Sequence, residues 1–330
     1  MAFTFNSLGN ADGANGSAND LFLKQFSGEV ITAFETANVM MPLHTVRTIS
    51  QGHTAQFPII GTGAAEYHTA GTDMLIDGGL SSIVHNERRI GIDALLTSYQ
   101  FIDSLDDAKN HYDYRSEYSR KMGYALAKSA DKSLINVLYN GSQVTASDDV
   151  PPEAVGGGNI ELSGDNGAES STNMIDALFS AAAVLDAAGV PDQERYVLLS
   201  PTYYYKLIAS TSFDVSTSVA NSDIGGSGFG SGIVPMVAGF EIFKTNHLPT
   251  ASETDDAKIH TDNNYVHTAP TNGLKGLVFH KSAIGTVKLR DLSMESEYQI
   301  ARQGTLMVAK YAMGHGILRP SCAVALINAS

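Results

Sequence analysis

The spacing of hydrophobic and polar positions changes several times along the chain, and each spacing predicts a different structural element. Residues 21–40 follow a capping pattern at Ser17–Asp20 and predict a helix that begins near Asp20. Its apolar positions at near-helical spacing are Phe22, Phe26, Val30 and Phe34. Gly28 costs this helix roughly 1 kcal/mol relative to Ala, so we expect docking to stabilise it. Residues 1–19 predict a flexible arm rich in Gly, Asn, Ala and Ser.

The next stretch, residues 53–92, has short apolar runs and frequent glycines, with too few periodic positions for a helix. It predicts an extended, glycine-hinged pair of strands. Residues 51–87 contain no Lys or Arg, and Arg88 and Arg89 then occur together at the base of the pair. Residues 92–102 predict a strand that returns to the body of the protein.

The strongest single pattern is a long helix over residues 104–140. Ser104 and Asp107 form a capping box at its start, and Gly141 stands where a helix stop is expected. About 35 helical residues would span roughly 50 Å, far above the mean helix length of about 11 residues. The predicted apolar stripe consists of Leu105, Ala108, Tyr112, Met122, Leu126, Leu134 and Leu138.

Residues 142–170 carry acidic side chains, no basic one and many turn residues, which predicts a boundary loop. A second body with alternating helices and strands follows, so the predicted fold class is α+β. Its elements are a helix over 172–188 that stops at Gly189, a strand over 195–200, a short helix from Pro201, a mobile loop over 218–232, strands over 239–248 and 276–280, long strands over 286–302 and 305–320, and a short strand after Pro320.

Composition excludes several classes of protein. The 330 residues include 35 acidic and 21 basic ones, a net charge of -14, and 17% are charged where about 25% is usual. A hydrophobic content of 43% suffices for a core, while the shortage of Lys and Arg argues against binding nucleic acid by charge. A single cysteine, Cys322, excludes an internal disulfide and a Cys-rich zinc site, and its Ala and Val neighbours predict a small buried side chain.

Targeting signals are lacking in the printed sequence. No Lys or Arg precedes Lys24, and no unbroken apolar stretch follows, as a secretory signal would require. No stretch reaches the roughly 18 apolar residues of a membrane span. We therefore expect an intracellular product without a membrane segment.

Paired carboxylates occur at Asp113 and Glu117, four residues apart on one face of the long helix. This spacing could share a proton or a metal ion. The simpler interpretation is an ion pair of Glu117 with Lys121, flanked by Arg115 and Arg120, because short motifs of this size mostly occur by chance. The functional alternative is an ion-pair contact with a neighbouring subunit.

Other candidate chemistry is weaker still. A cluster of possible metal ligands consists of Asp256, His260, Asp262 and His267. Carboxylate and imidazole groups are suitable ligands, but the cluster lies in a polar loop, which favours a solvated surface loop over a metal site. His315 lies between two glycines without a nucleophile motif, which favours a structural histidine in a turn. The glycine tract at 225–232 lacks the Lys of a phosphate-binding loop. We therefore predict no catalytic, cofactor-binding or metal-binding residue, and no enzyme.

Several segments together resemble the major capsid protein of short-tailed bacteriophages of the autographivirus (podovirus) group. They lie in the family's order and span nearly the whole chain, leaving only 142–170 and 250–273 unmatched. The matching segments are LFLKQFSGEVITAF (21–34), AQFPIIG (55–61), DAKNHYDYRSEY (107–118), HKSAIGTVKLRDL (280–292) and KYAMGHGILRP (310–320).

The resemblance implies the tailed-phage capsid shell fold, which the floor of herpesvirus capsids shares. It divides the chain into an N-terminal arm, an extended E-loop, a peripheral P-domain with a long spine helix, and an A-domain around the symmetry axes. The implied ranges are 1–50 for the arm, 51–90 for the E-loop, 91–141 and 285–305 for the P-domain with its spine helix at 104–140, and 142–284 and 306–330 for the A-domain.

The implied function is assembly of hexamers and pentamers into an icosahedral shell around double-stranded DNA. The implied partners are further copies of the chain, a scaffolding protein during assembly and a portal protein at one vertex. The implied location is the virion, after assembly in the cytoplasm of the bacterial host.

One departure from some shells of this fold follows from the residues themselves. Those shells crosslink neighbouring subunits through an E-loop lysine, which residues 51–87 lack, so we predict a non-covalent shell. The residues predicted to form contacts between subunits are Arg88, Arg89, Asp113, Arg115 and Glu117.

Two other classes of protein stay open. An extracellular adhesin or surface-layer protein shares the low charge and the Gly, Asn and Thr-rich loops, but would need a secretion signal. A hydrolase or metalloenzyme would need convergent titratable groups, which only residues 256–267 suggest.

Overall fold

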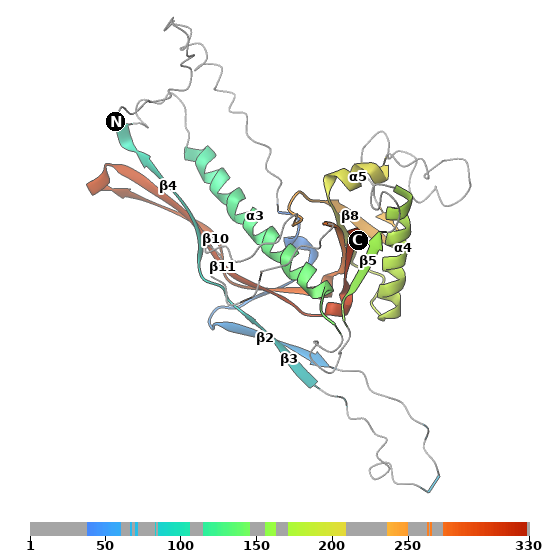
Figure 1. Cartoon of the computed structure of the whole chain (residues 1–330). Coiled ribbons are helices and arrows are strands. Elements are labelled where there is room, and N and C mark those ends of the chain that lie inside the picture. The colour runs from blue at the N-terminus through green and yellow to red at the C-terminus, as the bar shows by residue number, and fades with distance from the viewer. Residues whose placement is uncertain are drawn as a thin grey trace, which may run out of the picture.

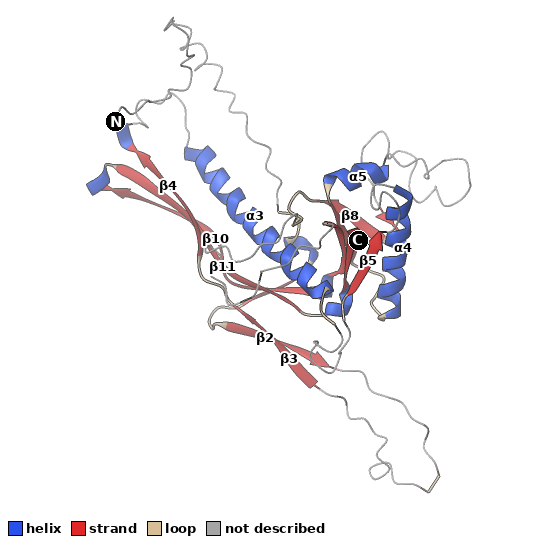
Figure 2. Ribbon diagram, in the orientation of Figure 1, coloured by secondary structure: helices blue, strands red, loops and turns tan. Residues whose placement is uncertain are grey.

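The computed structural model describes part of the chain in ordered elements (Figures 1 and 2). The described residues are 38–60, 67, 70–71, 83, 85–105, 115–145, 156–162, 171–208, 236–249, 263, 265 and 273–328. Several predictions lie outside them: the helix near Asp20, Asp113, the loop at 218–232, the glycine tract and the metal-like cluster at 256–267.

A four-stranded sheet in the order β1-β10-β11-β4 forms one body of the protein. Its centre is a long antiparallel pair, β10 and β11, in which the predicted strands near 286–302 and 305–320 are confirmed. β1 runs parallel to β10, and β4 runs antiparallel to β11. The bounds are Thr45–Thr48 for β1, Leu96–Asp103 for β4, Ile284–Gln299 for β10 and Gly304–Ile317 for β11.

A six-stranded sheet in the order β5-β12-β9-β6-β8-β7 forms the second body and lies beside the main hydrophobic core. Two helices accompany it, α4 (Ser171–Ala187) and α5 (Pro201–Ile208), as the periodicity predicts. The strand bounds are Gly158–Leu162 for β5, Arg195–Leu199 for β6, Met236–Val237 for β7, Phe240–Lys244 for β8, Leu274–His280 for β9 and Ala323–Asn328 for β12.

The long helix α3 (Arg115–Ser142) joins the two bodies. Its first half packs on the four-stranded sheet, where Met122 and Leu126 meet side chains of β11. Its second half enters the main core through Leu134 and Leu138, which are fully buried. Because one continuous helix contributes side chains to both cores, α3 connects the four-stranded sheet to the six-stranded sheet.

The predicted pair of extended strands is confirmed at its base. β2 (Thr54–Ile60) and β3 (His85–Gly91) form an antiparallel ladder from Thr54 opposite Gly91 to Ile60 opposite His85. The alternating burial of β2 places Ala55 and Ile59 on the covered side. The residues between the two strands are mostly outside the described part of the chain.

Four short 3-10 helices complete the described elements. They are η1 (Met41–Leu43), η4 (Lys281–Ala283), η5 (Ile300–Arg302) and η6 (Pro320–Cys322). Cys322 is fully buried in the core at the end of η6, so its predicted role as a small buried side chain is confirmed.

Two predictions about the start and end of the long helix are wrong. Leu105 is 60% exposed instead of contributing to the apolar stripe. Gly141 does not end the helix, which continues to Ser142; a Cβ at Gly141 would overlap the side chain of Ile317. Gly141 therefore serves close packing between α3 and β11, a requirement that local sequence does not reveal.

Two further predictions fail because strand pairing overrides local composition. Residues 142–170 are not entirely loop, since β5 forms there by parallel pairing with β12. His315 is not in a turn but inside β11, opposite Thr286 of β10. β11 is continuous across residues 305 and 306, because it pairs with β10 and β4 on both sides of that position.

Candidate assembly surfaces

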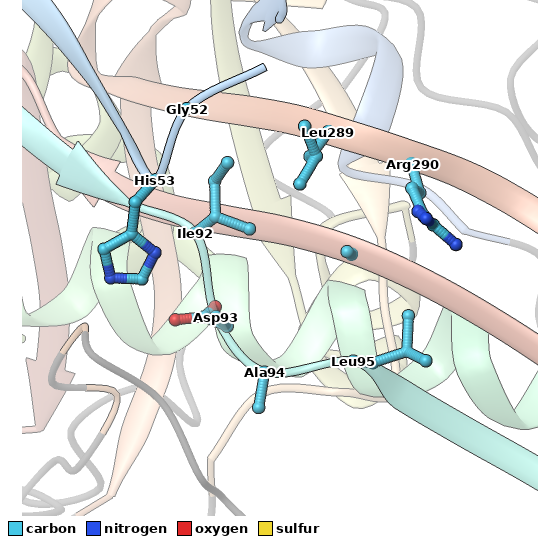
Figure 3. Close-up of a pocket in the computed structure, with 9 residues that line it drawn as sticks. Gly52, His53, Ile92, Asp93, Ala94, Leu95, Leu289 and Arg290 are labelled. Carbon is cyan, nitrogen blue, oxygen red and sulfur yellow. The ribbon is translucent and has the colours of Figure 1, made fainter. Parts of the chain in front are cut away.

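A pocket lies where the connection from β3 to β4 passes the bent part of β10 (Figure 3). Its volume is about 520 Å³, and the side chains of Ile92, Leu95, Leu289 and Arg290 surround it. Two irregularities of the β10–β11 register flank Arg290, so β-bulges shape this wall.

The carboxylate that lines the pocket accepts hydrogen bonds from two neighbouring side chains. Its carboxylate, Asp93, accepts a hydrogen bond from Asn263 Nδ2 at 2.8 Å and one from the Tyr265 hydroxyl. Burial and the neighbouring Asp93 charge raise the pKa of Tyr265, so this phenol stays protonated and donates. Tyr265 also accepts the backbone N–H of His315 at 2.9 Å, which ties the β3–β4 connection to β11.

No metal centre is formed by the described ranges, where no three His, Cys, Asp or Glu side chains gather suitably for an ion. The helices of the described part of the chain include none that could span a membrane.

A row of buried polar side chains links η1 to the four-stranded sheet. His44 Nδ1 contacts the Met40 carbonyl oxygen at 2.8 Å, so this nitrogen must carry the proton and donate. His44 Nε2 then accepts from the Thr286 hydroxyl at 2.5 Å, and Thr286 Oγ1 accepts from His315 Nδ1 at 2.8 Å. Every one of these bonds is satisfied with both histidines neutral.

The neutral state of this row predicts acid sensitivity. Burial lowers the pKa of His44 and lowers that of His315 to about 3, from 6.5. An unfolded chain therefore binds more protons below pH 6.5, so stability is complete above that pH and falls as the pH drops towards 3. We expect the free energy of unfolding to fall by up to roughly 1.4 kcal/mol per pH unit for each histidine.

Urea unfolding of the unassembled subunit between pH 7 and pH 4 measures this dependence. His315→Gln should lower stability at pH 7 and reduce the slope with pH. His53→Gln, at an exposed position, is the matched control and should leave the slope unchanged. An identical slope in the parent and His315→Gln would contradict the prediction.

A buried carboxylate that was not predicted from the sequence binds the backbone where the N-terminal segment reaches α3. Asp131 of α3 is fully buried and accepts the backbone N–H groups of Val39 at 2.9 Å and Met40 at 3.1 Å. His247 Nδ1 lies 3.4 Å from the same carboxylate. The sequence did contain a sign of this buried carboxylate, because Asp131 lies three residues before Leu134 and therefore on the apolar face of the predicted helix.

The predicted contact residues do not form one site within the chain. Arg88 and Arg89 lie on β3, whereas Arg115 and Glu117 lie in the first turn of α3, at the other end of the protein (Figure 1). Arg89 Nε donates to Glu87 Oε1 at 2.7 Å, so this exposed guanidinium has a carboxylate partner in its own chain.

Large apolar side chains are exposed at the far end of the four-stranded sheet. Tyr298 is 50% exposed and Ile300 is 76% exposed at the turn between β10 and β11, and Leu105 follows the adjacent end of β4. Tyr99 is 72% exposed on β4 itself. Apolar groups gathered at one end in this way are typical of a protein–protein contact.

The two sheets joined by a long helix, with an extended strand pair at their edge, define a shell subunit of the tailed-phage capsid class. The structure resembles the capsid structure of cyanophage P-SCSP1u with a TM-score of 0.77 and 38% identity, covering 100% of both chains. It also shares its fold with the mature capsid of bacteriophage PhiM1, at a TM-score of 0.69 and 19% identity over 90% of this chain and 89% of that one.

The chain belongs to the major capsid protein family described as Gp10A-like, whose family model matches residues 56–327. It is 35% identical over 331 residues to the major capsid protein of Escherichia phage T7, covering 95% of this chain and 93% of the relative. It is 34% identical over 340 residues to that of Enterobacteria phage T3, covering 97% and 96%. The resemblance found in the sequence is thus confirmed, and the function is that of a structural protein of the virion.

Proposed function

We propose that copies of this chain form hexamers and pentamers that close into an icosahedral shell around double-stranded DNA. Family membership across residues 56–327 carries this proposal. The exposed apolar end of the four-stranded sheet supports it, because such side chains need cover from a neighbour. Repetition of weak contacts around a closed shell gives high overall stability while single contacts stay reversible.

Electron microscopy of the expressed protein, alone and with the scaffolding protein of the same phage, tests the proposal. Uniform polyhedral shells in either sample would support it. Strictly monomeric protein under both conditions would contradict it.

Further partners follow from the same proposal. A scaffolding protein guides assembly in the host cytoplasm, a portal protein occupies one vertex, and no catalytic activity is required of the chain. The net charge of -14 favours a shell that encloses DNA without adhering to it, since like charges repel within a Debye length of roughly 8 Å.

The proposed domains follow the implied ranges with one revision. Residues 1–50 form the arm, 51–90 the E-loop, and 142–283 most of the A-domain. We place the second P-domain segment at 284–317 instead of 285–305, because the whole of β11 pairs within the four-stranded sheet. The final A-domain segment then begins at residue 318 and includes β12.

The shell is proposed to be held without covalent crosslinks. Residues 51–87 contain no lysine that could form an amide bond with a neighbouring side chain. Mature particles boiled in denaturant should therefore run as one band at the mass of the single chain, 35.0 kDa. A ladder of covalent oligomers on the gel would contradict this prediction.

The proposed contacts between subunits include Arg88, Arg89, Asp113, Arg115 and Glu117. Charge reversal at Arg115 or Glu117 should lower the yield of shells, and more strongly at low salt, because ionic contacts are screened as salt rises. Reversal at Arg89 should have a smaller effect, since Glu87 already neutralises it within the chain. Yields equal to the parent at every salt concentration would remove these residues from the interface.

A further inference from the structure

The pocket shown in Figure 3 leaves apolar surface uncovered beside a positive charge. Leu95 is 46% exposed at this pocket, and Leu289 forms a second apolar wall. Ala312 also lines it and packs in the cluster shared with β2 and β3, whereas its neighbours Tyr311 and Met313 pack in the cluster under α3. The pocket therefore lies on the face of the four-stranded sheet opposite α3.

Two irregularities of β10 aim a charged side chain at this pocket. Leu289 and Arg290 are successive residues, and successive side chains of a regular strand point to opposite faces. Both nevertheless line the pocket, because the register with β11 shifts on each side of Arg290. Bulges of this kind redirect side chains and are frequent beside functional sites.

The guanidinium group of Arg290 is available to a partner. Arg290 is exposed, and within the described part of the chain its side chain forms no ion pair and no hydrogen bond. Two carboxylates of the same region have other partners. Asp93 accepts a hydrogen bond from Asn263 Nδ2 at 2.8 Å, and Asp291 lies 3.5 Å from Lys288 Nζ. The pocket thus offers apolar walls and a cation to a partner with an apolar side chain and a carboxylate.

The turn between β10 and β11 carries these two complementary groups, and we name its residues 297–303 the sheet tip. Ile300 is 76% exposed at the start of η5. Glu297 is also exposed, and its carboxylate forms no ion pair with any residue that the structure describes. Glu295, by contrast, is paired with Lys310 at 2.6 Å.

Hydrogen bonds fix the conformation of the sheet tip. Gln303 is in the left-handed region, with a φ of 51°, and donates from Nε2 to the Ile300 carbonyl oxygen at 2.8 Å. Its side-chain oxygen accepts a hydrogen bond from the Tyr298 hydroxyl at 3.1 Å. An ordered turn therefore presents Ile300, and such a turn loses little conformational entropy on binding.

The sheet tip and the pocket of one subunit cannot meet. Ile300 lies ten positions after Arg290, a distance of about 30 Å along a strand. Figure 1 shows the turn at the end of the four-stranded sheet that is far from β2 and β3. A contact between the sheet tip and the pocket must therefore join two copies of the chain.

We propose that Ile300 of one subunit inserts into this pocket on a second copy of the chain, where Glu297 pairs with Arg290. The inference rests on the proposed shell function and names one contact between its subunits. An apolar anchor in a pocket together with an arginine is typical of interface hot spots. Because the sheet tip and the pocket are different surfaces, the contact is heterologous, and such contacts generate rings when the rotation closes.

Charge exchange tests the ion pair. Arg290→Glu or Glu297→Arg alone should lower the yield of shells about tenfold at physiological salt, because each brings like charges together. Arg290→Glu/Glu297→Arg in one chain should restore most of the yield, since the polarity is then inverted at every contact. Lys128→Glu changes the charge of an exposed position of α3 by the same amount and should assemble like the parent. Parental yields for both single variants, or no restoration in the double variant, would overturn the proposal.

The stability of the variants distinguishes a contact between subunits from a role inside one subunit. Arg290 and Glu297 are exposed and form no ion pair within the described residues, so their exchange should leave urea unfolding of the unassembled subunit unchanged. A loss of stability that parallels the loss of shells would place the action of these side chains inside the subunit and overturn the proposal.

A disulfide crosslink tests the insertion of Ile300. Oxidised particles of Leu95→Cys/Ile300→Cys should give covalent oligomers on a non-reducing gel. Each single cysteine variant should stay monomeric, because native Cys322 is fully buried. Crosslinking of either single variant would show that two sheet tips or two pockets meet each other, and would overturn the proposal. The absence of any crosslink in the double variant would overturn it as well.

The same experiments separate the inference from the proposed function. If the parent forms shells while charge exchange and crosslinking show no effect, this contact is wrong and the shell stands. If the parent forms no shells under any condition, the shell function and the contact both fail. If Arg290→Glu assembles normally but loses bound scaffolding protein, the pocket binds that partner and the proposal fails.

Discussion

Gly314→Val is expected to destabilise the subunit strongly and to lower the yield of assembled shells. Gly314 lies on β11, where a Cβ would overlap the carbonyl oxygen of Gly91 and come within 2.9 Å of its carbonyl carbon. These are backbone atoms and cannot rotate away. The Gly91 carbonyl also accepts a hydrogen bond from Asn263 at 2.9 Å, so displacing it breaks a second contact. We expect a loss of about 3 kcal/mol.

The measurement is urea unfolding of the unassembled subunit, with electron microscopy of the assembled product. Gly123→Ala is the matched control, because a Cβ at this position of α3 meets no atom within 4 Å. That change should be neutral or stabilise the subunit by up to about 1 kcal/mol, since Ala favours a helix over Gly. A Gly314→Val subunit as stable as Gly123→Ala would show that β3 and β11 can separate without cost.

Asp131→Ala is expected to destabilise the subunit by a similar amount. The substitution leaves the backbone N–H groups of Val39 and Met40 without their acceptor in a fully buried position. Each unsatisfied group costs about 1–3 kcal/mol, so we expect a loss of about 3 kcal/mol and release of the segment that leads into the N-terminal arm. Urea unfolding gives the first quantity, and the rate of limited proteolysis near residue 40 gives the second.

Two variants serve as controls for Asp131. Asp131→Asn keeps one acceptor oxygen and should lose less stability than Asp131→Ala. Asp176→Ala removes an exposed carboxylate from α4 and should change stability by less than about 0.5 kcal/mol. Unaltered proteolysis in Asp131→Ala would mean that other contacts hold the arm exit.

Elements with a strong local signal were predictable from the sequence. The helix at 171–187 was predicted to within a residue, because its apolar stripe recurs at helical spacing and Gly189 follows with a φ of 67°. β6 was predicted because five successive residues suit a buried strand. The function of a major capsid protein was predicted from several segments that match the family and follow one another in the family's order. The 35% identity to the major capsid protein of Escherichia phage T7 confirms it.

Features that depend on a distant partner were not predictable. β5 exists because β12, more than 150 residues later, supplies parallel hydrogen bonds, while its own residues resemble a loop. The contacts of Lys244 with Tyr204 and Tyr205 were not predicted, because β8 lies beside β6 only in the folded sheet. The contact residues remain a prediction, because their partners belong to other subunits.

Local sequence was sufficient to predict the α+β class, the long helix and the shell family, because periodicity, helix signals and matching segments are properties of neighbouring residues. Three features became visible only in the folded chain. Gly141 and Gly314 stand where two elements pack closely, and His44, Thr286 and His315 form one hydrogen-bonded row. Asp131 binds the backbone of Val39 at the end of the N-terminal segment. The physical reason is that each of these depends on atoms brought together from distant parts of the chain, where burial and geometry, and not residue type, set the energy.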